Sequence, residues 1–181
     1  MKTNHKTWVL SFLALCCTTL TAFLPAVAGL LPEGNTSKEY CNVRYDFCIE
    51  YPDYIFTQAD VSANGDGIIL TSKDENMQLR ASGYYNVMEL PVMSEYEDFL
   101  EVIKLDNEGM TIRELEKRFS DNEFECLIEA GNQLYYQKTE LYGHDFISLG
   151  LVINQKNYWE KAQSRQAFEE LRDLIRLKTG S

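Results

Sequence analysis

The second half of the chain alternates short apolar segments with very short polar breaks, and this pattern constrains the fold more than any other feature. Between Thr111 and Asn154 the breaks fall at residues 120–122, 131–132 and 143–145. A parallel pair of strands needs a crossover of about a dozen residues or more, so breaks of this length join antiparallel neighbours. The region therefore predicts an antiparallel sheet.

Two segments of this region place their apolar residues differently. Within residues 123–130, apolar side chains and alanine alternate with glutamates, which predicts a strand with one wet face. Residues 146–153 are apolar on both faces, which is typical of a strand in the middle of a sheet that is covered on both sides.

The first part of the domain also has strand periodicity. Alternation from Val43 to Tyr51 predicts a first strand that Pro52 ends. The turn sequence Asn64-Gly65-Asp66-Gly67 then predicts a hairpin, and a second polar break at residues 73–76 precedes a return strand. Met77, Leu79, Ala81 and Gly83 line one face of that strand, and Gln78, Arg80 and Ser82 line the other.

Two helices complete the pattern. Ser94 and Glu97 have the spacing of a capping box, in which both side chains accept hydrogen bonds from free amides, so a helix is expected to begin at Ser94 and to stop at residues 107–109. A second helix is expected over residues 159–178, with basic residues near its C-terminal end that suit the helix dipole. The prediction is an α+β fold in which two main helices pack on an antiparallel β-sheet of about six or seven strands.

Residues 1–28 have the organisation of an export signal. Lys2 and Lys6 form a positive start, and the apolar core that follows, residues 8–23, is shorter than the roughly 20 residues of a membrane-spanning helix. Ala26-Val27-Ala28 then gives the small-x-small pattern of a cleavage site. We expect a signal peptide and a protein that is periplasmic or secreted.

The rest of the chain is expected to be a flexible leader at residues 29–39 and a single α/β sandwich domain at residues 40–181. An alternative is a lipid anchor on Cys16 or Cys17. The bulky Leu15 argues against Cys16 as a lipoprotein site, so a soluble exported protein is favoured.

The charge of the chain narrows its partners. The sequence has 28 acidic residues against 17 lysines and arginines, a formal net charge of -11. Such a surface repels nucleic acid and anionic membranes, and it attracts a basic partner protein. Beyond the signal peptide we expect no integral membrane segment.

Three cysteines remain after the signal peptide. Cys41 and Cys48 flank a short stretch and are expected to form a disulfide in an oxidising compartment. Cys126 lies in an apolar alternation, where a buried free thiol is the expected state. A zinc site is disfavoured, because there is no second CxxC and His144 is the one histidine left.

Two patterns suggest chemistry only weakly. Oxygen-bearing side chains at Asp60, Asn64 and Asp66 are similar in spacing to the start of a calcium-binding loop, but no glutamate follows at the twelfth position, so a hairpin turn is favoured. His144 lies in an expected turn and no nucleophile elbow is present, so it is interpreted as an exposed turn residue. No cofactor is predicted.

Tyrosines offer the best candidates for contact with a partner. In adjacent pairs on a strand, one ring is expected to point inward and the other outward, which leaves some tyrosine surface exposed. The candidates are Tyr84, Tyr85, Tyr135, Tyr136 and Tyr142. Cross-strand aromatic packing is the alternative interpretation.

The run from Tyr40 to Pro52, YCNVRYDFCIEYP, followed by the turn at residues 64–67, resembles small exported bacterial proteins of uncharacterised function. The strand that ends in Tyr-Pro is similar to the opening of the PsbP/DcrB-like α/β sandwich. This resemblance implies helices packed on an antiparallel sheet, and it implies a binding, assembly or immunity role, with no catalytic residue to carry over.

The function expected from the sequence is that of a non-enzymatic periplasmic binding protein for another protein, as an inhibitor or immunity factor for a basic partner. Two alternatives remain at this point. One is a small carboxylate-dependent hydrolase that holds a divalent cation near Asp60 to Asp66. The other is a structural component of the cell envelope.

Overall fold

The computed structural model describes residues 36–157 and 161–180. The expected signal peptide, the two signal cysteines and most of the expected leader lie outside the described residues. Within the described ranges, no helix has both the length and the apolar character needed to cross a bilayer.

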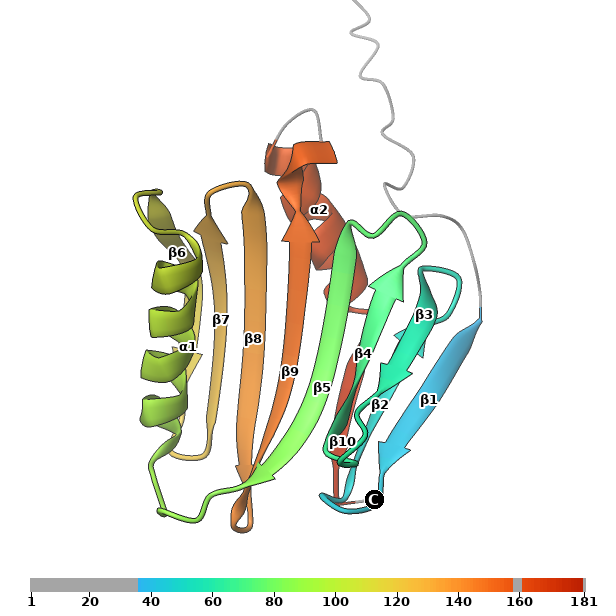
Figure 1. Ribbon diagram of the computed structural model, residues 1–181, viewed down its shortest axis with the longest axis vertical. Helices are drawn as coiled ribbons and strands as arrows, with labels where there is room; N and C mark the ends of the chain where they lie inside the picture. The colour runs from blue at the N-terminus through green and yellow to red at the C-terminus, as the bar shows by residue number, and fades with distance from the viewer. Residues whose placement is uncertain (1–35, 158–160, 181) are drawn as a thin grey trace, which may run out of the picture.

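A seven-stranded antiparallel sheet forms the centre of the molecule, in the order β3-β4-β5-β9-β8-β7-β6 (Figure 1). Its strands are β3 (Phe56–Val61), β4 (Gly67–Ser72), β5 (Met77–Tyr85), β6 (Ile112–Phe119), β7 (Glu123–Ala130), β8 (Gln133–Tyr142) and β9 (Asp145–Asn154). Strand β9 lies in the middle, as its apolar faces predicted. The predicted α+β class, with two helices on such a sheet, is confirmed.

A second, three-stranded antiparallel sheet consists of β1 (Ser37–Asn42), β2 (Phe47–Pro52) and β10 (Arg176–Thr179), with β2 in the middle. This sheet was not predicted from the sequence. Strand β1 begins at Ser37, among residues that were expected to belong to the leader.

The prediction of one strand from Val43 to Tyr51 is wrong, because the chain turns back on itself after Asn42. The Asn42 side-chain oxygen accepts hydrogen bonds from the backbone amides of Arg44 and Tyr45, at 3.0 and 3.2 Å, which holds the turn. Val43 is 95% exposed. The alternation across Val43 and Tyr45 therefore came from turn residues, although Tyr45 is buried and packs against Gly83 of β5.

The two helices are α1 (Val92–Asp106) and α2 (Lys161–Arg172), and a short 3-10 helix, η1 (Gln155–Asn157), follows β9. Helix α1 begins two residues before the expected start. Its N-cap is Pro91 and has no side-chain cap, so the capping box predicted for Ser94 and Glu97 is wrong. Proline before the first helical residue already has a suitable φ and lacks an amide that needs a partner.

The expected helix over residues 159–178 is too long at its C-terminal end. Helix α2 ends at Arg172, and Arg176–Thr179 forms β10 against β2. The basic side chains that were assigned to the helix dipole lie on this strand instead, where Lys178 and Arg176 both form ion pairs with Glu50 on β2. Pairing with a distant strand has overridden the local helical pattern.

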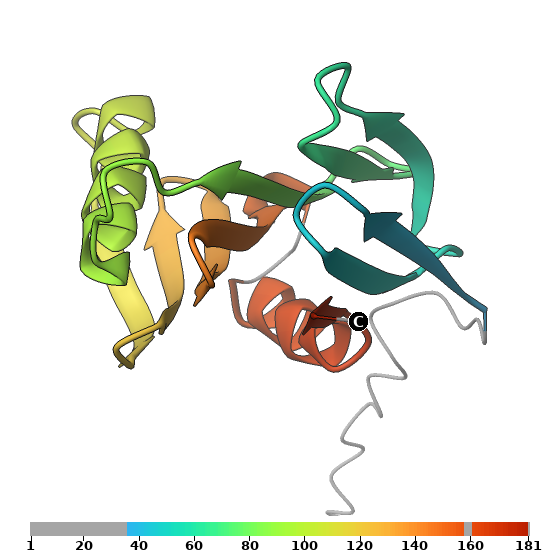
Figure 2. The same cartoon turned by 90° about the horizontal axis from the view of Figure 1, so that it is seen from below.

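The seven-stranded sheet has a hydrophobic core on each face. On one face, α1 covers the β6–β8 end, and Val92, Tyr96 and Ile103 are buried there against β7 and β8. On the other face lie α2 and the small sheet, with Phe47, Ile49 and Phe168 in the core (Figure 2). The C-terminal half of β7 is buried on both faces for this reason, so the wet face expected at Glu129 is wrong, whereas Glu123 and Glu125 remain partly exposed.

The cysteines have the expected states. Cys41 and Cys48 are directly opposite each other on β1 and β2 and form a disulfide. Cys126 is a buried free thiol, and burial raises its pKa to about 12, so the unreactive protonated form dominates at neutral pH.

We expect removal of the disulfide to lower the free energy of unfolding. The double variant Cys41→Ala/Cys48→Ala should lose about 2 to 3 kcal/mol of its free energy of unfolding. Without the disulfide, the short loop between the two positions is no longer closed in the unfolded chain, which gains entropy. Urea unfolding of the variant and of oxidised wild type measures the loss. Reductant should destabilise the wild type alone; an equal response in the double variant would contradict the assignment.

We also expect stability to fall in alkali through Tyr136. Burial raises the pKa of this phenol, and Glu125, which accepts its hydrogen bond, raises it further. The folded state then keeps a proton that the unfolded state releases near pH 10. The contribution of Tyr136 to the free energy of unfolding is therefore complete below pH 10 and is lost as the pH rises above it. From pH 9 to pH 11 the wild type should lose about 1.4 kcal/mol more than Tyr136→Phe. Tyr142→Phe, at an exposed position, should keep the wild-type slope.

Candidate functional site: a groove beside helix α1

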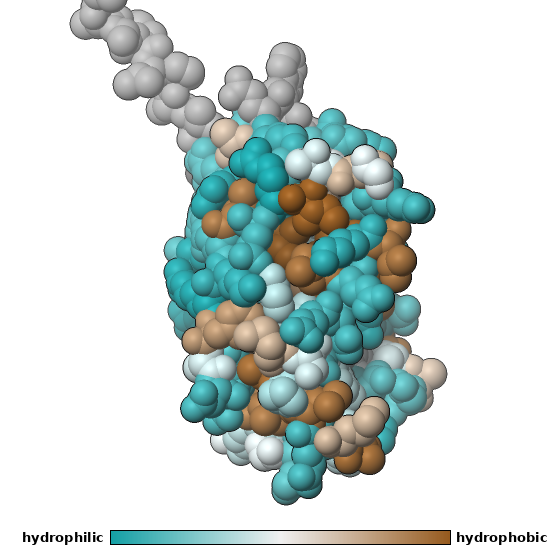
Figure 3. Space-filling view, turned by 90° about the vertical axis from the view of Figure 1, so that its left-hand side faces the viewer, coloured by the Kyte–Doolittle hydropathy of each residue, from teal (hydrophilic) through white to brown (hydrophobic). Residues whose placement is uncertain are grey.

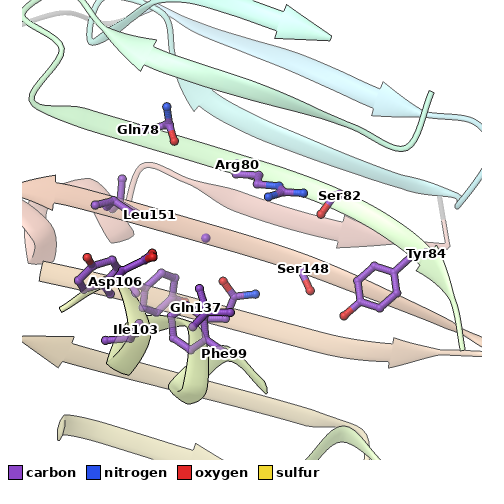
Figure 4. Close-up of a pocket in the computed structure, with 15 residues that line it drawn as sticks. Gln78, Arg80, Ser82, Tyr84, Phe99, Ile103, Asp106, Gln137, Ser148 and Leu151 are labelled. Carbon is purple, nitrogen blue, oxygen red and sulfur yellow. The ribbon is translucent and has the colours of Figure 1, made fainter. Parts of the chain in front are cut away.

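An open groove lies between α1 and β5, on the face of the large sheet that carries α1 (Figure 4). Its volume is about 350 Å³, within the range of about 300 to 1,000 Å³ that is typical of ligand pockets. The wall on the α1 side is formed by Phe99, Val102, Ile103 and Asp106. Polar residues of three strands contribute to the floor and the opposite side: Gln78, Arg80, Ser82 and Tyr84 on β5, Gln137 on β8 and Ser148 on β9.

The groove exists because one helix does not cover the whole sheet. Helix α1 packs mainly on β7 and β8, so the same face of β5 is left open. Alternation along β5 buries Leu79 and Ala81 on the opposite face and directs Arg80 and Ser82 toward α1's side. Three of these polar residues were already grouped on one strand face by the sequence pattern.

Gly150 makes room in the floor. It lies on β9 between Arg80 of β5 and Gln137 of β8, which are its two register partners. A Cβ atom at this position would lie 2.8 Å from the Gln137 Oε1 atom. The missing side chain therefore lets the Gln137 amide lie over the backbone of β9.

Hydrogen bonds hold the polar floor in place. Gln137 Nε2 donates to Thr139 Oγ1 at 3.0 Å, and this hydroxyl is 2.9 Å from Ser148 Oγ on the adjacent strand. At one end of the groove the Tyr84 hydroxyl donates to Glu95 of α1. Burial raises the pKa of Tyr84, and its hydrogen bond to Glu95 raises it further, so the phenol remains a donor that ties β5 to the helix.

The charges that face the groove form no ion pair with a described residue. Arg80 and Asp106 are exposed, and neither forms a hydrogen bond or an ion pair with any residue that the structure describes. Asp98 lies one turn from Val102 on α1, and its charge contributes to the raised pKa of Tyr84. The groove thus presents one cation beside β5 and carboxylates beside α1.

Two of the five candidate tyrosines are buried in the two cores. Tyr135 packs on α1's side of the sheet, where its hydroxyl accepts a hydrogen bond from Asn107 Nδ2 at 3.1 Å. Tyr136 packs against Phe168 of α2 on the opposite side, with ring centroids 5.2 Å apart. Both faces of β8 are covered, so the expectation of one exposed ring in this pair is wrong.

The other three candidate tyrosines lie nearer the surface. Tyr84 is half-buried and lines the groove. Tyr85 is exposed at the end of β5, where the Arg44 guanidinium lies over its ring at 5.4 Å. Tyr142 is exposed at the end of β8. The structure therefore places the five candidates on both faces of the sheet. Tyr84, Tyr135 and Tyr136 line the groove, and of these only Tyr84 has a half-exposed side chain.

The residues considered for a cation form a hairpin turn. The Ser62 hydroxyl and Asn64 Nδ2 both donate to the Asp66 carboxylate, the latter at 2.7 Å, and these hydrogen bonds lower the pKa of Asp66. Asp60 is exposed on β3 and does not join them. In the described part of the chain, one group of side chains has metal-ligand spacing: Glu39, Cys41 and Cys48. Its two sulfur atoms are joined in the disulfide.

His144 occupies the turn between β8 and β9, as expected. Its backbone oxygen accepts a hydrogen bond from the Asn86 amide at 2.9 Å. Within residues 36–157 and 161–180, its imidazole makes no hydrogen bond to a serine or a cysteine.

The fold has known counterparts. No family model matches the chain, and no curated protein matches it in sequence. The solution structure of cyanobacterial PsbP (CyanoP) from Synechocystis sp. PCC 6803 is 11% identical, with a TM-score of 0.51 over 84% of this chain and 99% of that one. The Ran-binding protein Mog1p of Saccharomyces cerevisiae is 9% identical, with a TM-score of 0.53 over 78% of this chain and 95% of that one. At these identities the likeness shows the fold, and the predicted resemblance to the PsbP-like fold is confirmed at that level.

Proposed function

We propose that the chain is a non-enzymatic binding protein that holds another protein in the groove between α1 and β5. The observation that carries the proposal is a formed groove in which Arg80 and Asp106 form no ion pair or hydrogen bond with a described residue. A folded protein that leaves Arg80 and Asp106 facing one hollow gains nothing from them in its own stability, whereas a partner can use both. The fold is compatible with this role, since Mog1p, which shares it, is a Ran-binding protein.

The surface around α1 supports a basic partner. Helix α1 carries one exposed lysine, Lys104, and more exposed carboxylates: Glu97, Asp98, Glu101 and Asp106. Apolar side chains such as Val102 and Leu105 are exposed among them. Figure 3 views the side of the molecule formed by α1 and β6, where apolar patches lie between hydrophilic residues. Apolar contacts among carboxylates suit a protein that combines basic and apolar side chains.

We place this protein in the periplasm or outside the cell, where it acts as an inhibitor or immunity factor for its basic partner. The Cys41–Cys48 disulfide supports the compartment, because disulfides persist in oxidising surroundings. The net charge of -11 supports the sign of the partner and rapid association with it.

Capture of a partner from periplasmic extract of the native host tests the binding surface. Immobilised wild type should retain a stoichiometric protein, and Val102→Arg should lose it, because the new cation blocks the groove wall. Val61→Arg on β3 is the matched control, since Val102 and Val61 are both 54% exposed. The control should retain the partner.

Salt dependence separates specific charge pairing from adsorption. Capture should weaken between low and moderate salt without disappearing, as expected for exposed charges around an apolar contact. The absence of a stoichiometric partner at both salt concentrations would contradict the proposal, as would equal loss in both valine variants.

The proposed compartment has its own test. Protein recovered from the native host should have the mass of a chain that starts at Gly29, and it should partition into the aqueous phase of a detergent extraction. A mass that includes a lipid on Cys16 or Cys17 would show that the protein is anchored to a membrane, and would contradict the soluble form. A chain that keeps residues 1–28 would contradict export with cleavage.

A further inference from the structure

Arg80 is an exposed arginine that forms no ion pair with a residue that the structure describes. Arg118, Arg165 and Arg172 all form ion pairs with carboxylates, although the first two are about half-exposed or more. Arg80 lies between Ile69 on β4 and Gly150 on β9 in the sheet register, and neither position carries an acid. Hydrogen bonds from Ser62 and Asn64 lower the pKa of Asp66, and the charge of Arg80 helps to lower it, but this carboxylate forms no ion pair with Arg80.

The neighbours of Arg80 are themselves suited to an anion. Gln78 and Ser82 flank it on the same strand face (Figure 4). Amide and hydroxyl groups donate hydrogen bonds to carboxylate oxygens, and a guanidinium binds a carboxylate through two parallel hydrogen bonds. This part of the groove therefore offers a carboxylate a positive charge and hydrogen-bond donors.

The remaining walls set two further requirements. Phe99 and Val102 give the α1 wall an apolar surface, so the group attached to the carboxylate should be apolar. Asp106 lies at the same wall and forms no ion pair with a described residue, so this end of the groove repels a second anionic group and attracts a cation. A ligand that fits carries a carboxylate, an apolar side chain and a cation within a short length.

We propose that the groove binds the C-terminal end of a partner polypeptide, with the terminal carboxylate at Arg80, an apolar last side chain against Phe99 and Val102, and a basic side chain near Asp106. This inference rests on the proposed function and names the part of the partner that is recognised. A volume of about 350 Å³ is near the lower limit of ligand pockets, which suits a chain end better than a helix or a long segment that passes through. A terminal carboxylate also has no side-chain rotamers to fix, so less entropy is lost on binding.

Fluorescence anisotropy with short labelled peptides tests the inference on the folded, oxidised protein. The main peptide ends in lysine, alanine and leucine with a free carboxylate. A second peptide has the same sequence with a C-terminal amide, and a third has an amide end and a glutamate side chain as its one carboxylate. The free acid should bind at least about tenfold more tightly than either of the others, because each lacks the paired terminal charge.

Two variants assign the contacts. Arg80→Gln should weaken the free acid by about tenfold or more and leave the amide peptide nearly unchanged. Arg113→Gln is the matched control, since Arg113 is an exposed arginine on β6, outside the groove, and forms no ion pair with a described residue. Asp106→Asn should weaken the peptide by about twofold to fivefold, and only while the peptide contains its lysine. Thermal melting of each variant shows that the fold is intact.

The outcomes distinguish this inference from the broader proposal. Equal binding of the acid and the amide would overturn recognition of a carboxylate, and preference for the glutamate peptide would overturn recognition of a chain end. If the native partner is still captured at full strength by Arg80→Gln but is lost with Val102→Arg, the groove remains the binding site and the carboxylate inference alone fails. Loss of the partner with Arg80→Gln, but not with Arg113→Gln, would support both.

Discussion

The need to cover a seven-stranded sheet on both faces determines most of this structure. Strand β9 is apolar on both sides, so water must be excluded from each face of the centre of the sheet. The described part of the chain contains two α-helices, and they cover different faces. On α2's side the three-stranded sheet completes the cover. On α1's side nothing completes it among the described residues, and β5 presents polar side chains there, beside the groove.

Local sequence patterns predicted the elements whose partners lie nearby in the chain. The hairpins of β3–β5 and β6–β9 follow from short turns and two-residue alternation, which act over a few residues. The small sheet could not be predicted in this way. Its strand β10 lies far from β2 in sequence. The local pattern of residues 176–178 is that of a helix, and only pairing with β2 makes this segment a strand. The turn after Asn42 was missed because Val43 and Tyr45 extend the strand alternation by chance.

The sequence predicted only part of the site. Alternation placed Gln78, Arg80 and Ser82 together on one strand face, but it gave no reason to choose that face over any solvated one. The groove arises from tertiary packing: α1 covers the sheet only as far as β8, and Gly150 leaves space on β9, the next strand. The tyrosines were a weaker guide, because the exposure of a ring depends on both layers that face its strand. Tyr135 and Tyr136 are buried for that reason.

The electrostatics of the groove bear on how a partner would be selected. Exposed pairs of charges contribute little to folding, because they lose side-chain entropy and are screened by solvent. The same charges gain importance when a partner covers them, since desolvation strengthens each matched pair and makes each mismatched one costly. A cation on β5 and carboxylates on α1 would then reject a purely acidic or a purely basic ligand at one side or the other. The acidic surface can therefore hasten the approach of many basic proteins, while Arg80 restricts which of them fit the groove.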